Sequence, residues 1–394
     1  MLVEREWPEV WRLHWLCPLH KRDAHSDAKN YRGVHLTTIL SKVVERVLAL
    51  HLVRFLDCSD AFGPNQWAFR SKRSCRDLVT LLVCTWLRAL RFGQKVALYL
   101  SDISGAFDKV DRGIMVARLR AAGVSNAFCE LIHSYLDARH ARVVVQSCQS
   151  HPYAIGNQVF QGTVLGPPLW NCFFKSVSEI IEAHQYTDAK FADDLSAFRS
   201  YASTVSSQDI LSDLRSLQFD VHAWGLPNRV SFDSGKEHFV IFHKRQNYGD
   251  DFKLLGTLVD TKLSMASECQ RVRKKAAPKA QAILATRGFY SIRDLIGQFK
   301  SHVWCHLEFS SGAIYHAADS HLKDVDSVQD SFIRALGLSA ESAFVDFKMP
   351  PLCLRRDIAI LGLLHKVVLG IAHPEFAELF FCVFTLGSAQ RTHN

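Results

Sequence analysis

Three aspartates stand where their carboxylates could do chemistry together. Asp102 lies at the end of a short apolar run, VALYLSDI over 96–103, and Asp193 and Asp194 are adjacent in KFADDLSAF over 190–198. A buried carboxylate without a partner is costly, so a converging set of three needs a cation. Carboxylate oxygens suit Mg²⁺, and two such ions can activate an attacking hydroxyl and stabilise a leaving group. The pattern predicts a site for two Mg²⁺ ions, with Mn²⁺ as an alternative metal, although the Asp-Asp pair alone also fits a solvated turn.

The sequence around these carboxylates predicts the elements that must hold them. The apolar run over 96–103 has no helical period and predicts a buried strand, whereas apolar residues at helical spacing predict a helix over 128–136. A long buried helix is expected after Gly166, and helices containing Lys and Arg are expected beyond residue 265. Further strands are expected over 141–149, 190–198, 231–244 and 251–260. Strands and helices therefore mix throughout the chain.

The composition is that of an ordinary globular enzyme. The chain has 394 residues, of which 48% are hydrophobic and 22% charged, enough for two or three packed subdomains. Its net charge of +8 suits a polyanionic partner but is also common in proteins that never bind nucleic acid. Eleven cysteines without a CxxC pair predict reduced thiols and an intracellular location, nuclear or cytoplasmic. No signal sequence or membrane anchor is expected, and no feature sets an oligomeric state.

Seven blocks of this sequence resemble, in order, the successive motifs of a reverse transcriptase. These blocks are 28–48, 66–79, 100–112, 159–170, 190–198, 236–242 and 253–260. The resemblance is closest to the non-LTR (LINE-type) retrotransposon class, because NYRGVHLT, AFDKVD and FADD match that class's versions of these motifs. The tail over 307–337 and 352–361 is similar to the region after the polymerase core in LINE proteins. Seven ordered blocks are far more specific than any single motif.

The resemblance implies an α+β fold, the right-hand polymerase. Its fingers would come from the first ~95 residues and the stretch before the fourth block, and its palm would be an antiparallel sheet backed by helices. A helical thumb would follow residue 260. We therefore expect fingers and palm over 1–260, and a thumb with the LINE-type carboxy-terminal region over 261–394.

The resemblance also assigns the three aspartates. Asp102 would be the metal ligand of motif A, and Asp193 and Asp194 would be the carboxylates of motif C, so all three are expected to be catalytic and to bind metal. Asp108 and Asp111 are expected to orient the turn and helix that follow motif A.

Four more residues would contact the incoming nucleotide. Phe107 matches the bulky ring beneath the sugar, where a 2′-hydroxyl would clash, with core packing as the alternative. Gln161 and Gly162 match the motif B pair that lies against nucleotide and template, since glycine permits close approach. Lys236 matches the motif D lysine, a proton donor to the leaving pyrophosphate, with an ordinary surface lysine as the alternative.

Cations would hold the phosphates. Arg32 and either Lys21 or Arg22 lie in the block resembling the fingers hairpin that grips the triphosphate. Arg70 would bind the same group or template phosphates, and a solvated surface role fits it equally. A basic cluster at the start of the thumb would bind primer and template backbone: Arg271, Arg273, Lys274 and Lys275. A solvated helix face is the alternative for this cluster, and Pro278 is expected to bend or restart its helix.

The sequence also departs from the family pattern. Gly33 and Phe160 stand where the family usually has proline, and Gly105 replaces a frequent lysine, changes expected to affect efficiency more than chemistry. The chain starts inside the fingers block and has no endonuclease or Cys/His-rich segment. We therefore expect a fragment or a decayed copy of a longer element protein.

The implied function is RNA-directed DNA polymerase activity of a retrotransposon. The enzyme would extend a primer 3′-hydroxyl with dNTPs by two-metal catalysis, with an RNA template and a DNA primer as partners. One alternative is a catalytically inactive, truncated remnant that only binds nucleic acid. Another is a nucleotide cyclase with a similar carboxylate-bearing palm, which gives no reason for Gln161-Gly162 or the basic thumb.

Overall fold

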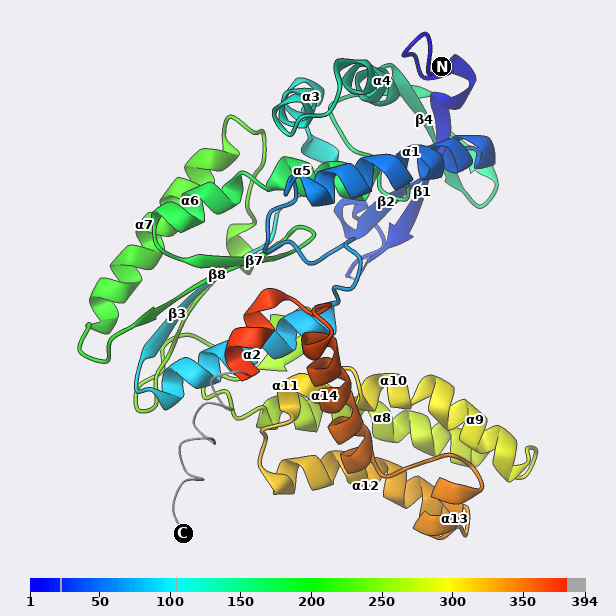
Figure 1. Ribbon diagram of the computed structural model, residues 1–394. Coiled ribbons are helices and arrows are strands. Elements are labelled where there is room, and N and C mark those ends of the chain that lie inside the picture. The colour runs from blue at the N-terminus through cyan, green and yellow to red at the C-terminus, as the bar shows by residue number, and fades with distance from the viewer. Residues whose placement is uncertain (22, 104, 381–394) are drawn as a thin grey trace. The chain divides into compact units, whose positions relative to one another are not determined.

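The computed structural model describes residues 1–21, 23–103 and 105–380, and its elements are labelled in Figure 1. The chain divides into two compact units, each assembled from several segments. Unit 1 comprises Met1–Phe69, Tyr99–Phe198 and Leu211–Glu237. Unit 2 comprises Arg70–Leu98, Arg199–Ile210 and the chain from His238 onward. The division expected from the sequence, 1–260 and 261–394, is a functional one and stays a prediction.

One sheet of unit 1 has five strands. They are β1 (Leu13–His20), β2 (Tyr31–Leu36), β4 (Arg139–Val145), β5 (Cys148–Gln149) and β6 (Tyr153–Ile155). The order is β2-β1-β4-β5, with β6 also on β4, and β1 pairs with β2 antiparallel and with β4 parallel. The single strand expected over 141–149 is wrong, because Gln146 and Ser147 adopt positive φ and turn the chain into a hairpin.

A second sheet carries the aspartates. Its order is β7-β8-β3-β9, with bounds β3 (Lys95–Ser101), β7 (Thr187–Phe191), β8 (Asp194–Tyr201) and β9 (His238–Phe242). Every residue of β3 is buried, as its unbroken apolar run predicts, while β7 and β8 form an antiparallel hairpin. Strands β3 and β8 contribute residues to both units. The expected strand over 96–103 is confirmed, whereas the stretch 190–198 is strand only on either side of a turn at Ala192 and Asp193, as the end of β7 and the start of β8.

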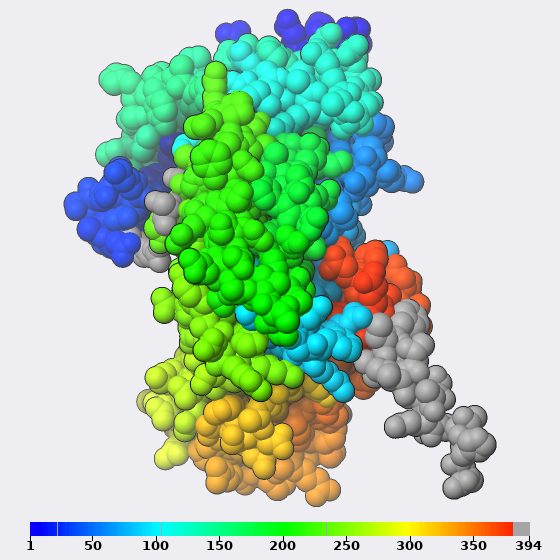
Figure 2. Space-filling view, turned by 90° about the vertical axis from the view of Figure 1, so that its left-hand side faces the viewer, coloured from blue at the N-terminus to red at the C-terminus, as the bar shows by residue number. Residues whose placement is uncertain are grey.

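Helices cover the sheets of unit 1. They are α1 (Ile39–Cys58), α3 (Arg112–Ala121), α4 (Asn126–Leu136), α5 (Gly166–Phe174), α6 (Val177–Ala183) and α7 (Ser207–Gly225). Figure 1 shows α6 and α7 on one side of β7 and β8, and Figure 2 shows this green segment at the surface that faces the viewer. Helix α7 buries Leu214, Leu217 and Val221, at helical spacing, so it presents one apolar face inward.

The long helix expected after Gly166 is interrupted. Helix α5 ends at Phe174 and α6 begins at Val177. Ser176 lies at the break, and its hydroxyl accepts a hydrogen bond of 3.0 Å from Trp224 Nε1. Lys175 and Ser176 both keep helical backbone angles, so the interruption is slight.

Unit 2 is mainly helical beyond residue 265, as the sequence predicts. Its helices are α2 (Cys75–Arg91), α8 (Ala266–Ala285), α9 (Ile292–His302), α10 (Trp304–Leu307), α11 (Ser311–Ile314), α12 (Asp319–Ala335), α13 (Ala340–Val345) and α14 (Leu352–Val368). Phe299 of α9 packs on Phe332 of α12, with ring centroids 4.3 Å apart. In the described part of the chain, no helix has the length and apolar character needed to cross a membrane.

Two local expectations in unit 2 are corrected. The strand expected over 251–260 is a hairpin of β10 (Phe252–Leu254) and β11 (Thr257–Val259), because Leu255 and Gly256 adopt positive φ. Helix α8 does not restart at Pro278, which lies inside it. Pro278 is exposed, so the carbonyl that it leaves without an N–H partner can be solvated, which offsets part of the roughly 3 kcal/mol cost of an interior proline.

Candidate active site

The structure brings the three aspartates together in unit 1. Asp102 directly follows the buried strand β3, Asp193 lies in the turn of the β7–β8 hairpin, and Asp194 is the first residue of β8. Burial and the negative charge of Asp102 raise the pKa of the Asp193 carboxyl. Burial, followed by the charges of Asp193 and Asp102, raises the pKa of Asp194 to about 6. The three carboxylates therefore share one region of excess negative charge.

Lys236 supplies a positive charge to this region. It ends the short 3₁₀ helix η4 (Ser234–Lys236), and its Nζ lies 2.5 Å from Asp102 Oδ2 and 3.2 Å from Asp233 Oδ2. The backbone N–H of Asp233 donates to the carbonyl of Asp102 at 3.0 Å, which ties η4 to the end of β3. The hydrogen bond to Asp102 raises the pKa of Lys236, so its ammonium form is stabilised.

The donor set fits a divalent cation in its chemistry. The charge of Asp102 raises the pKa of Asp193, and the charges of Asp193 and Asp102 raise that of Asp194, so this group gains from a nearby divalent ion. Carboxylate oxygens are the hard ligands that Mg²⁺ prefers. Among the described residues, no group of three or more His, Cys, Asp or Glu side chains has the geometry to hold a metal ion. The ammonium of Lys236 offsets the charge of Asp102.

Phe107 lies in a short helix that follows Asp102 in the chain. It lies in η3 (Ala106–Lys109), which begins after Gly105 at a φ of 65°, a conformation that glycine adopts readily. The half-buried ring of Phe107 stacks on Trp170 of α5, with centroids 5.6 Å apart and planes at 22°. Packing and partial exposure therefore occur together, so a support for the ring and a free edge are both present.

Gly162 is required by a close approach of two backbones. Gln161 and Gly162 lie in the loop before α5, and the Gln161 carbonyl accepts the His35 N–H at 2.8 Å. Gly162 has a φ of 93°, and a Cβ added there would lie 3.0 Å from both the His35 carbonyl oxygen and Val34 Cγ1. Any side chain would push this loop away from β2.

A buried histidine pair lies behind that loop. His14 Nε2 and His35 Nδ1 are 2.7 Å apart, and both side chains are almost fully buried. Burial is the main cause that lowers the pKa of His14 to about 3 and that of His35 to about 4, and the nearby charge of Arg139 lowers both further. Both imidazoles are therefore neutral near pH 7.

Glu45 of α1 is a positioning residue that sequence reasoning missed. Its carboxylate is fully buried, accepts the N–H of Val164 at 2.8 Å and of Leu165 at 3.4 Å, and accepts the hydroxyl of Ser41 at 3.1 Å. It thus holds the chain that leads from Gly162 into α5. A glutamate on the buried face of an otherwise apolar helix is the sequence signal that could have found it.

Glu237 is a second missed residue. Its side chain accepts from Tyr99 Oη at 2.5 Å and Gln218 Nε2 at 2.5 Å, and lies 2.7 Å from His222 Nε2. Burial alone would raise its pKa, but these hydrogen bonds bring the net pKa below the usual range. Glu237 therefore fixes the backbone next to Lys236 against β3 and α7.

Two of the predicted phosphate ligands lie on the β1–β2 hairpin. The positive charge of the exposed Arg32 lowers the pKa of Asp193 and so opposes the rise that burial causes there. The charge of Lys21 has the same effect on the raised pKa of Asp108. Arg22, the alternative to Lys21, lies outside the described residues. The expected role of Asp111 is confirmed, since it caps α3 by accepting the Ile114 N–H at 3.1 Å.

The predicted nucleic-acid ligands all lie in unit 2 and differ from one another. The guanidinium of Arg271 binds both carboxylate oxygens of the buried Glu268, at 2.6 and 2.7 Å, and the Gly256 carbonyl at 2.8 Å. Three exposed residues of α8 make up the rest of the cluster: Arg273, Lys274 and Lys275. Arg70 is half-buried. The nucleic-acid roles of these residues stay predictions, and that of Arg271 competes with its structural bonds.

Comparison with known proteins identifies the family. The family described as "Reverse transcriptase (RNA-dependent DNA polymerase)" matches residues 19–242, more than half of the chain. The chain is 22% identical over 349 residues to a probable RNA-directed DNA polymerase from transposon X-element of Drosophila melanogaster, covering 84% of this chain and 38% of that protein. It is 23% identical over 333 residues to the RNA-directed DNA polymerase from mobile element jockey of Drosophila funebris, covering 79% and 36%. This chain thus spans less than half the length of these relatives.

Solved structures agree on the fold. Apo telomerase from Candida tropicalis has a TM-score of 0.53 at 11% identity, covering 87% of this chain and 59% of that chain. Telomerase from the same organism, in complex with a fragment of telomeric RNA, has a TM-score of 0.50 at 13% identity, covering 85% and 55%. At such identity the likeness concerns the fold alone, and it confirms the expected right-hand polymerase. The order of its motifs, its fold and the family match agree, and the chain belongs to the reverse transcriptase (RNA-dependent DNA polymerase) family.

Proposed function

We propose that this chain extends a DNA primer along an RNA template, using dNTPs. The observation that carries the proposal is the meeting of Asp102, Asp193 and Asp194, whose charges act on one another. Their carboxylate oxygens are the ligand type that metal ions bound to a triphosphate prefer. The family match establishes that the chain belongs to the reverse transcriptases. The proposal adds that this chain itself carries out the reaction.

In the proposed reaction the primer 3′-oxygen attacks the α-phosphorus of the dNTP. A new P–O bond forms, the bond from the α-phosphorus to the bridging oxygen breaks, and pyrophosphate leaves with that electron pair. The proton of the 3′-hydroxyl passes to solvent, and the ammonium of Lys236 gives a proton to the pyrophosphate. Asp102, Asp193 and Asp194 would hold two Mg²⁺ ions, which when bound acidify the hydroxyl and neutralise phosphate charge.

Other residues of the chain select and hold the nucleotide. The exposed edge of Phe107 excludes a 2′-hydroxyl, while its other side rests on Trp170. Gly162 lets the loop lie flat, with Gln161 beside it, against nucleotide and template. Arg32 and Lys21 contact the triphosphate from the β1–β2 hairpin.

The exposed cations of α8 support binding of primer and template. Arg273, Lys274 and Lys275 can each contact a backbone phosphate, an interaction that weakens as salt rises. The related telomerase was solved in complex with an RNA fragment, which is in keeping with an RNA template for the fold.

Primer extension tests the proposal. The protein is given a primed RNA template, the four dNTPs and Mg²⁺, and the products are compared with those formed in excess EDTA. Metal-dependent extension that follows the template sequence is expected. Binding of the primed template without any extension would instead favour an inactive remnant, and cyclisation of a nucleotide without a template would favour a cyclase.

A further inference from the structure

The turn that carries Asp193 holds an unusual backbone conformation. Ala192, the residue before Asp193, has a φ of 59°, the left-handed region that residues with a side chain seldom adopt. Glycine or asparagine would be the ordinary choice for this position. The surrounding structure must therefore hold Ala192 in place.

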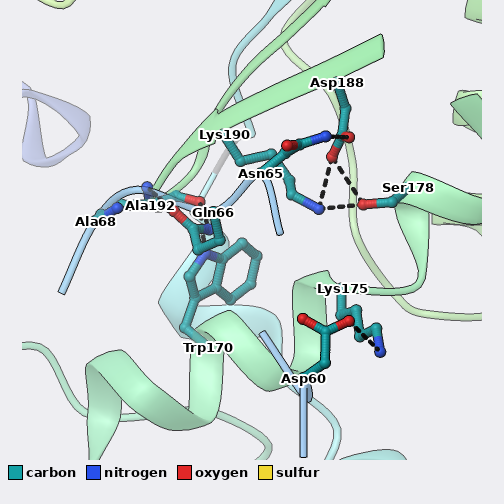
Figure 3. A network of polar contacts seen from close by, with 10 residues as sticks. All are labelled: Asp60, Asn65, Gln66, Ala68, Trp170, Lys175, Ser178, Asp188, Lys190 and Ala192. Carbon is teal, nitrogen blue, oxygen red and sulfur yellow. Dashed lines mark hydrogen bonds and ion pairs between the residues drawn. The ribbon is translucent and has the colours of Figure 1, made fainter. Parts of the chain in front are cut away.

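The segment 65–67 pairs with β7, the strand before this turn. The backbone carbonyl of Asn65 accepts the N–H of Lys190 at 2.9 Å, and the N–H of Trp67 donates to the Lys190 carbonyl at 2.9 Å. Side chains strengthen the pairing, because Asn65 Nδ2 donates to Asp188 Oδ1 at 2.8 Å. Asp188 is itself paired with the buried Lys190 at 2.8 Å, and Figure 3 shows these side chains gathered around its carboxylate with Ser178.

The middle residue of that segment, Gln66, binds both backbone groups of Ala192. Its fully buried amide accepts the Ala192 N–H at 3.1 Å through Oε1 and donates to the Ala192 carbonyl at 3.3 Å through Nε2. The same Oε1 accepts the N–H of Ala68 at 3.0 Å, which fixes the orientation of the amide. A glutamate could not replace it, since the donor to the carbonyl would be lost.

Trp170 of α5 completes the hold on Ala192. Its indole Nε1 donates to the Ala192 carbonyl at 3.0 Å, and Figure 3 shows the indole directed at the turn beside Gln66. The face of the same indole stacks on Phe107, at 5.6 Å between centroids. One fully buried side chain thus touches the aspartate turn and the ring proposed to lie beneath the sugar.

We infer that Gln66 and Trp170 are positioning residues of the polymerase site, and that they divide the work. Gln66 holds the left-handed turn and so sets the direction of Asp193. Trp170 supports the turn through its N–H and supports Phe107 through its ring face, so Trp170 links turn geometry to sugar selection. This inference rests on the proposed function for its effect on nucleotides, whereas its effect on the turn does not.

Hydrogen exchange tests the hold on the turn without requiring activity. We compare wild type, Gln66→Met and Trp170→Phe in the peptide 187–198, with the peptide 126–136 of α4 as an internal reference. The matched control is Gln329→Met, since Gln329 of unit 2 is also a buried glutamine that accepts from an indole, Trp304, and donates to a carbonyl. Exchange at the turn should rise about tenfold or more in Gln66→Met and less in Trp170→Phe, and stay unchanged in Gln329→Met. Equal protection of the turn in wild type and Gln66→Met would overturn the inference.

Nucleotide selection tests the division of work. The ratio of dNTP to rNTP incorporation is measured in Gln66→Met, Trp170→Leu and Trp170→Phe, the last of which keeps an aromatic ring. We expect a lower rate with an unchanged ratio in Gln66→Met, a ratio lowered at least about fivefold in Trp170→Leu, and recovery of the ratio in Trp170→Phe. An unchanged ratio in a folded Trp170→Leu, or an altered ratio in Gln66→Met, would contradict the inference. Absence of any incorporation by wild type would refute the proposed function instead, and the exchange measurement would still decide the hold on the turn.

Discussion

The ammonium of Lys236 lies 2.5 Å from Asp102 Oδ2 and neutralises the first carboxylate of the candidate site. The residue proposed to give a proton to the leaving pyrophosphate thus occupies an oxygen that a metal ion would also use. Since one oxygen lone pair cannot serve both fully, binding of a divalent ion must weaken this ion pair. The relationship leads directly to the first prediction.

Replacement of Lys236 by Gln should lower two kinetic quantities, the maximal extension rate and the Mg²⁺ requirement. The maximal extension rate should fall by about 10²-fold, because the proton donor is gone. The Mg²⁺ concentration for half-maximal rate should also fall, because the ammonium no longer competes for Asp102. A Mg²⁺ titration of extension measures both, with Lys323→Gln, an exposed lysine of α12, as control. A rate equal to wild type, or a higher Mg²⁺ requirement, would refute the assignment.

Removal of the Phe107 ring should admit ribonucleotides. Phe107→Ala opens space for the 2′-hydroxyl, which the ring excludes by overlap and not by an attractive contact, so the ratio of rNTP to dNTP incorporation should rise about tenfold or more. Phe107→Tyr retains the ring and serves as the matched control. If both variants keep the wild-type ratio, Phe107 serves only to pack on Trp170.

The basic cluster of α8 should divide into binding and structural residues. Joint replacement of Arg273, Lys274 and Lys275 by Gln should weaken primer-template binding for unrelated sequences alike, and each lost phosphate contact should flatten the slope of log K against log salt by about 0.9. Arg271→Gln should instead lower the thermal stability, because it removes the positive charge paired with the buried Glu268. Wild-type affinity and salt slope in the triple variant would show that these residues form only a solvated face.

The buried pair of His14 and His35 should make unit 1 less stable in mild acid. Their pKa values are lowered from 6.5 to about 3 and about 4, so the unfolded chain takes up protons that the folded chain does not. The contribution of the two neutral histidines to the free energy of unfolding is fully present above pH 6.5. It is lost as the pH falls below that value, by up to about 1.4 kcal/mol per pH unit for each histidine. Asp194, with its raised pKa, acts in the opposite direction, so the comparison must be made between variants.

Urea unfolding at pH 7 and pH 5 measures this dependence. His35→Gln should flatten the loss of unfolding free energy relative to wild type, whereas His151→Gln, which changes an exposed histidine of the same unit, should not. Identical pH dependence in wild type and His35→Gln would contradict the account.

Residue type and order along the chain were enough to predict the core of the site. Asp102 was found because a charged residue at the end of an apolar strand is rare, and Asp193-Asp194 because they follow it at the spacing of a known motif. Gly162 was assigned by resemblance, and the structure adds a local reason, the contact with the His35 carbonyl.

The residues that hold the site could not be predicted in the same way. Gln66, Glu45 and Glu237 act through backbone groups and side chains that lie far away in sequence, so their roles appear only when the chain is folded. The sequence predicts continuous strands through the hairpins at 146–147 and 255–256, because neither Gln146-Ser147 nor Leu255-Gly256 is a dipeptide typical of such turns. Pro278 was expected to interrupt α8, but its exposure leaves the freed carbonyl open to water.

A single comparison tests the central claim most directly: extension of a DNA primer on an RNA template by wild type and by Asp193→Asn, under single-turnover conditions in saturating Mg²⁺. The substitution keeps the volume of the side chain and removes a metal-binding charge, so primer-template affinity and thermal stability should remain close to wild type. We predict template-directed extension by wild type and loss of at least about 10³-fold in the variant. Extension by Asp193→Asn at more than a few per cent of the wild-type rate would contradict the account.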